Sequence, residues 1–126
     1  MATPLATDTL LATARAHAAA GAWPEVRAAL SREPDIAWAR PELAVLMGEA
    51  LLRTGSTREA RTWLSGALPQ LERGRNAPAL RRGVNLAGAA AFELGELEDA
   101  EAMFERALDL ARRDNDDLTA ARATNN

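Results

Sequence analysis

Residues 84–108, VNLAGAAAFELGELEDAEAMFERAL, decide the fold. Two segments rich in alanine and leucine lie on either side of Gly95. Glycine adopts the left-handed backbone conformation with which many helices end, at no steric cost. The segment that follows Gly95 places its apolar residues on one helical face. The stretch therefore predicts two helices that are joined by a tight turn and packed against each other.

Similar units precede this one. Gly21 and Gly55 also separate a helical stretch rich in alanine or leucine from an amphipathic one, and the three glycines are spaced by 34 and 40 residues. Self-similarity at such a period is typical of stacked helical hairpins. The first unit is the least regular, with Ala14 at the small-residue position and Trp23 after the turn.

Small and large residues alternate between the paired helices. When the last two units are aligned on their turn glycines, Gly48 falls on Gly88 and Leu64 falls on Phe104. Glycine inside a helix costs roughly 1 kcal/mol relative to alanine. We therefore expect Gly48 and Gly88 to lie where a neighbouring helix approaches closely, with Leu64 and Phe104 filling the space between the helices of one unit.

The stretch 84–108 resembles a tetratricopeptide repeat nearly throughout; the second unit resembles one well and the first only loosely. The resemblance extends over about residues 7–126. It implies an all-α fold, a right-handed α-solenoid of antiparallel helix pairs with about three such units plus a C-terminal helix. We expect a single domain over residues 1–126, with units at about 7–40, 41–80 and 81–120 and a partial fourth unit at 121–126.

Prolines, glycines and capping residues predict the helix boundaries. Residues 34–40 are expected to be a connector, Ser56–Glu59 a capping box that opens a helix, and Pro69 a point at which that helix is kinked or broken. Asp114 or Asn115 is expected to cap a separate last helix. The predicted helices are residues 4–20, 24–33, 41–53, 57 to about 73, 77–94, 97–113 and 116–124.

Composition narrows the class of protein. The chain is 48% hydrophobic and has no cysteine, which favours a globular domain and excludes disulfides, cysteine-ligated zinc and thiol catalysis. A net charge of -3, with acidic and basic residues interspersed, argues against nucleic-acid binding. All 15 basic residues are arginine, which indicates a GC-rich bacterial genome. Without a signal peptide or a long apolar run, no membrane partner is expected and a cytoplasmic location is predicted.

Catalytic chemistry finds little support. His17 is the single histidine, and its helical spacing favours a packing role over catalysis or metal binding. The carboxylates at 96–101 begin a predicted helix, where they interact favourably with its dipole. No enzyme activity, cofactor or metal is therefore expected.

The resemblance implies a concave face lined by the first helix of each unit. Arginine can hold a carboxylate there in a bidentate manner, asparagine can bind an extended backbone, and Leu52 and Phe92 can form an apolar floor. The alternative is that these are ordinary surface residues and that Phe92 packs beneath the following helix. The residues assigned to this face are Arg15, Glu42, Glu49, Leu52, Arg53, Arg82, Asn85, Ala89, Phe92, Glu93, Arg122, Asn125 and Asn126.

Three functions remain open. The first is a non-catalytic scaffold that binds a peptide or protein partner in the concave groove. The second is a self-associating repeat module, a homo-oligomer formed through the C-terminal end. The third is a fragment of a larger bacterial transcriptional regulator or signalling protein, a possibility that rests on repeat length alone.

Overall fold

The computed structural model describes the backbone of residues 4–125 and the side chains of residues 5–115. The described chain is all-helical, which confirms the predicted fold class. None of its helices is both long and apolar enough to cross a membrane. Its helices are α1 (Pro4–Ala19), α2 (Trp23–Ser31), α3 (Pro34–Ala39), α4 (Pro41–Arg53), α5 (Thr57–Arg73), α6 (Ala77–Glu93) and α7 (Leu97–Asn125).

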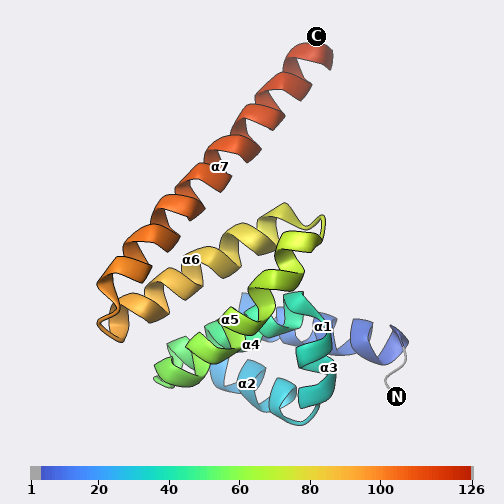
Figure 1. Cartoon of the computed structure of the whole chain (residues 1–126). Helices are drawn as coiled ribbons and strands as arrows, with labels where there is room; N and C mark the ends of the chain where they lie inside the picture. The colour runs from blue at the N-terminus through green and yellow to red at the C-terminus, as the bar shows by residue number, and fades with distance from the viewer. Residues whose placement is uncertain (1–3, 126) are drawn as a thin grey trace.

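The helices pack as successive pairs. Helix α1 packs against α2, α4 against α5, and α6 against α7. Helix α4 also contacts both α1 and α6, so the first helices of the three pairs lie next to one another, while α5 contacts α6 and α2 contacts α4. Figure 1 shows this progression from the N-terminus to the long α7. The predicted stack of helical hairpins is therefore present.

The three turn glycines have the predicted conformation. Gly21, Gly55 and Gly95 have φ values of 72°, 89° and 80°. At the second turn the backbone N–H of Ser56 donates to the carbonyl of Leu51 at 2.8 Å, a helix-ending bond that recurs at the other two turns. The same geometry thus ends α1, α4 and α6.

The two mid-helix glycines allow the predicted close approach. A Cβ atom added to Gly48 would lie 2.6 Å from the side chain of Leu64, and one added to Gly88 would lie 2.9 Å from the ring of Phe104. Leu64 is completely buried between α4 and α5, whereas Phe104 is 38% exposed. The small-against-large packing expected from the 40-residue register is confirmed.

The predicted capping box is wrong in one respect. Ser56 is the N-cap of α5, but its side chain makes no capping hydrogen bond. Its hydroxyl accepts instead from Arg27 Nη1 at 3.0 Å, and the same guanidinium nitrogen donates to Thr54 Oγ1 at 3.1 Å. Because a cation from α2 uses the hydroxyl, Ser56 joins the first pair of helices to the second.

Residues 34–39 form a helix, α3, where a connector was expected. Pro34 lies in its first turn, a position in which a proline has no helical bond to lose. Trp38 stacks on Trp63 of α5, with ring centroids 4.1 Å apart. A Cβ atom at Gly66 would lie 2.4 Å from the Trp38 ring, so Gly66 provides the space for this contact. Tertiary packing therefore stabilises a helix that is too short to be stable alone.

Two expected helix interruptions are absent. Pro69 lies inside α5, which is continuous, so it does not break the helix. Both Pro69 and Ser65, whose carbonyl loses its helical partner, lie on the exposed face, where water can replace the missing donor. The expected break at Asp114 or Asn115 is also wrong, because α7 continues to Asn125. This region has neither the glycine nor the proline that separates α5 from α6.

The glycine contacts predict a graded response to alanine. Gly48→Ala is expected to lower the free energy of unfolding by about 1–3 kcal/mol, because the buried Leu64 cannot move away. Gly88→Ala is expected to cost less than about 1 kcal/mol, because the Phe104 ring can shift toward solvent and alanine favours the helix. Chemical denaturation of both variants measures the difference. Equal losses in the two would contradict this account of the packing.

Candidate binding groove

A cavity of about 430 Å³ opens between the first helices of the three pairs. Its wall contains apolar groups from α1, α4 and α6, together with Trp23 at the start of α2. Charged and amide side chains lie among them. The lining residues are Arg15, Ala18, Ala19, Trp23, Glu42, Val45, Leu46, Glu49, Asn76, Pro78, Ala79 and Arg82.

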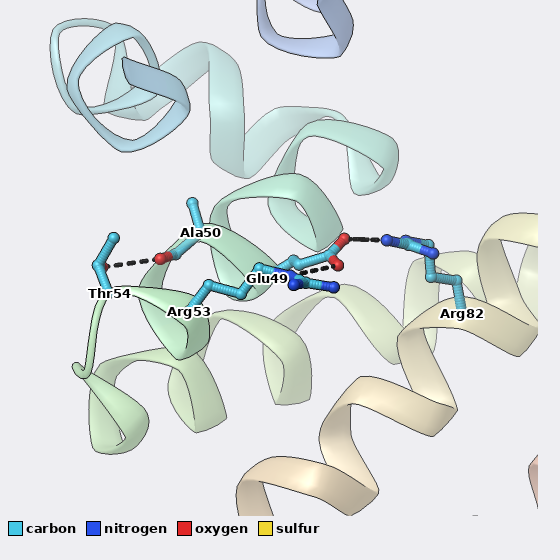
Figure 2. Close-up of polar contacts among 5 residues, drawn as sticks. All are labelled: Glu49, Ala50, Arg53, Thr54 and Arg82. Carbon is cyan, nitrogen blue, oxygen red and sulfur yellow. Dashed lines mark hydrogen bonds and ion pairs between the residues drawn. The ribbon is translucent and has the colours of Figure 1, made fainter. Parts of the chain in front are cut away.

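Glu49 is the electrostatic centre of this cavity. Its side chain is only 1% exposed, the one buried charged residue of the described core. One carboxylate oxygen accepts from Arg53 Nε at 3.0 Å, one helical turn away, and the other accepts from Arg82 Nε at 3.0 Å and from Arg82 Nη2. Figure 2 shows the carboxylate between the two guanidinium groups. A buried carboxylate requires such pairing, since an isolated charge would be very costly to bury.

The Glu49 network connects three helices. Arg82 extends from α6 to α4, so its bond joins the third unit to the second. The guanidinium carbon of Arg53 lies 4.8 Å from the ring centroid of Trp23, in a cation–π contact with α2. The side chains of Arg53 and Arg82 are about half exposed, at 55% and 54%. Each cation therefore keeps water on one side while it neutralises the buried acid on the other.

Asn76 closes the cavity at the N-terminus of α6. Its Oδ1 accepts from the backbone N–H of Ala79 at 3.1 Å and caps the helix, while its Nδ2 donates to Glu42 at 3.3 Å. Burial raises the pKa of Glu42, but hydrogen bonds from its own backbone N–H and from Asn76, with the charge of Arg40, outweigh this effect and hold the pKa below its usual range. Glu42 is therefore a second fixed anion in the wall.

Arg15 differs from the other charged groups of this wall. Glu42, Glu49 and Arg82 already have partners within the protein. Arg15 is exposed and has no hydrogen-bond or ion-pair partner among the residues that the structure describes. Its guanidinium can donate to a carboxylate or to carbonyl groups of a bound molecule. The cavity thus combines apolar walls with one available cation.

The structure brings together part of the site expected from the sequence. Arg15, Glu49 and Arg82 line the cavity, and Arg53 holds Glu49 from behind. Leu52 is partly buried and packs against the core instead of forming a floor. Asn85 lines a different cavity, between α6 and α7, and Phe92 is 61% exposed near the end of α6. The side chains of Arg122 and Asn126 lie outside the described residues.

Sequence reasoning missed two members of the site. Trp23 was noted only for following a turn glycine, and Asn76 only as the start of a helix. The side chain of Trp23 reaches the cavity because α2 begins directly after the Gly21 turn, beside the end of α1. The position of Asn76, 34 residues after Glu42, was the available signal, since a spacing of one repeat places equivalent residues side by side in adjacent units.

A comparison with protein families matches residues 40–113 to the tetratricopeptide repeat. The chain belongs to the tetratricopeptide repeat family. This match covers the second and third helix pairs, which the sequence indicated as the most regular units. Tetratricopeptide repeats generally act as protein-interaction scaffolds and are generally non-catalytic. Comparisons with curated proteins and with solved structures gave no match.

Metal binding finds no support in the tetratricopeptide-repeat groove. Among the side chains that the structure describes, no three histidine, aspartate or glutamate residues gather as metal ligands do. The buried carboxylate of Glu49 is already satisfied by arginines, and no buried polar side-chain atom of the described residues lacks a partner. The groove is therefore organised by its own internal ion pairs.

The network predicts the cost of removing its central charge. Glu49→Gln keeps the shape of the side chain but weakens both charge-assisted hydrogen bonds, and we expect the free energy of unfolding to fall by about 1–3 kcal/mol. Glu101→Gln, an exposed site on α7, is the matched control and should change it by less than about 0.5 kcal/mol. Urea denaturation of the two variants provides the measurement. An unchanged stability of Glu49→Gln would mean that the ion pairs contribute nothing to folding.

The low pKa of Glu42 predicts a pH dependence. A carboxylate whose pKa is lower in the folded state stabilises the fold above its unfolded pKa, and this contribution is lost as the pH falls through the folded value. The stability difference between the wild type and Glu42→Gln should therefore be largest near neutral pH and shrink in acid. Thermal unfolding of both proteins across the acidic range tests this. A difference that stays constant with pH would show that the ionised state of Glu42 does not contribute.

Proposed function

We propose that this tetratricopeptide repeat protein is a non-catalytic scaffold that binds a peptide or protein segment in the cavity between α1, α4 and α6. The observation that carries the proposal is the arrangement around Glu49. Two arginines neutralise the acid, and apolar residues surround it, while Arg15 at the same cavity keeps its donors available. Such a surface is already ordered before a partner arrives, which lowers the entropic cost of binding.

The lining indicates the chemistry of the bound segment. Trp23, Val45 and Leu46 offer an apolar wall to an aliphatic or aromatic side chain. Arg15 offers donors to an acidic side chain or to backbone carbonyl groups beside it. A basic side chain finds no available anion in this wall, because Glu42 and Glu49 are occupied by their partners. The preferred ligand is therefore an apolar segment with a neighbouring acidic residue.

A displayed library of random peptides, selected on the full chain, tests the proposal. We expect the enriched peptides to combine an apolar side chain with an acidic one. Their affinity should fall about 10-fold or more in Arg15→Ala, the loss expected when one charge-assisted contact is removed. Arg58→Ala, at an exposed arginine of α5 outside the cavity, is the matched control and should bind as the wild type does.

Two results would contradict the proposal. Selection that enriches no peptide would remove the groove as a peptide-binding surface. Enriched peptides whose affinity falls equally in Arg15→Ala and Arg58→Ala would show that binding depends on overall charge. In that case the contact made by Arg15 would have no special role.

A further inference from the structure

A second cavity lies between α6 and α7, outside the groove described above. Pro78, Arg81, Arg82 and Asn85 line it from α6, and Phe104, Ala107, Leu108 and Ala111 line it from α7. Phe104 is 38% exposed and Leu108 is 51% exposed, so this side of the last pair presents apolar surface to solvent.

The preceding unit shows what such a surface normally holds. Shifting the α7 residues back by the 40-residue repeat gives Leu64, Ala67, Leu68 and Leu71 of α5, which together with Val45 of α4 receive α6. Leu64 is completely buried there, whereas its counterpart Phe104 is not. The cavity between α6 and α7 is therefore the seat for one more helix, and the described chain does not fill it.

We propose that residues 116–125 of a second copy of this chain occupy this seat, each copy donating its segment to the other. The corresponding helix of the third unit is α6, and a shift of 40 residues places Arg122, Ala123 and Asn125 on Arg82, Gly83 and Asn85. The end of α7 thus carries the beginning of a fourth first helix. Reciprocal exchange of one element between two copies is a common route to a dimer.

The segment cannot fill the seat of its own chain. Helix α7 is continuous from Leu97 to Asn125, and Figure 1 shows its last turns standing clear of the other helices. At a rise of 1.5 Å per residue, Ala123 lies about 18 Å beyond Ala111 along a straight helix. A second copy is thus the molecule that can bring residues 116–125 to this cavity.

Side-chain size fits the exchange. A Cβ atom at Gly83 would lie 3.1 Å from Leu71 and 3.4 Å from Leu68 and Val45, so the α6 seat is tight. In the open seat the counterparts of Leu71 and Gly83 are Ala111 and Ala123. The wall loses a large side chain at the position where the incoming helix gains a methyl group. The two changes compensate, as close packing requires.

Charge also fits the exchange. In the occupied seat Asn76 of the incoming helix donates to Glu42 of the receiving unit at 3.3 Å. A shift of 40 residues replaces this pair by Asp116 and Arg82. The hydrogen-bonded pair of the occupied seat thus becomes a pair of opposite charges in the open one. Arg82 is about half exposed and has donors beyond those it gives to Glu49, so it can accept a second acidic partner.

Light scattering over a micromolar concentration series tests the dimer. We expect the mass to rise from 13.5 kDa to twice that value. Leu108→Glu, which places a charge in the seat, should remain at the monomer mass with unchanged helicity. Leu5→Glu is the matched control, because Leu5 is 75% exposed on α1, and it should still dimerise. A wild type that stays monomeric, or a Leu108→Glu variant that dimerises, would overturn the proposal.

Cross-linking identifies the occupant, because the natural chain has no cysteine. In a Leu108→Cys, Ala123→Cys double variant, a straight α7 holds the two thiols about 22 Å apart, too far for a disulfide within one chain. Oxidation should therefore give a covalent dimer that links position 108 of one copy to position 123 of the other. A disulfide within one chain, or no disulfide at all, would show that a second copy does not occupy the seat.

Discussion

The close approach of paired helices at Gly48 and Gly88 is the constraint on which the other contacts depend. Without a side chain at Gly48, α4 lies directly against Leu64 of α5, and this buries Leu64 completely. The glycine costs roughly 1 kcal/mol of helix propensity, but full burial of a leucine returns about 1.5–3 kcal/mol. Because the pair is held this close, α4 and α5 together form a surface on which α6 can sit, and the same step repeats along the chain.

The polar contacts make the joined units specific as well as stable. Arg82 and Asn76 of α6 both reach acids of α4, so the third unit is fixed to the second by directed bonds in addition to apolar contact. The charges of the cavity wall consequently have settled positions before any partner binds. Since Glu42 and Glu49 are neutralised internally, the electrostatic character of the cavity depends on Arg15. The ion pairs that join the units thereby determine which ligand chemistry the groove can distinguish.

The features that could be predicted from the sequence are those that residue type and period determine together. Gly55 had to adopt positive φ because the register put it at a helix end, and Gly48 had to face a large residue. Helix α3 could not be predicted, because it depends on the contact of Trp38 with Trp63 and Gly66, far away in the sequence. The register likewise assigned Arg15, Glu49 and Arg82 to one face. It gave no measure of position along that face, which separates them from Asn85 and Phe92.

The long α7 shows how a helical array depends on its next member. At the end of α5, Gly74 closes the helix and Asn76 caps the next one, which the seat on α4 and α5 then holds. At the end of the third unit Asp114 and Asp116 stand at these positions, and Asp114 pairs with Arg81 inside an unbroken helix. A turn orders several residues at a cost of about 1–2 kcal/mol each, and it forms only where the helix after it gains more than that by packing. Sequence punctuation and an available seat act together, so a helix without the first continues past the second.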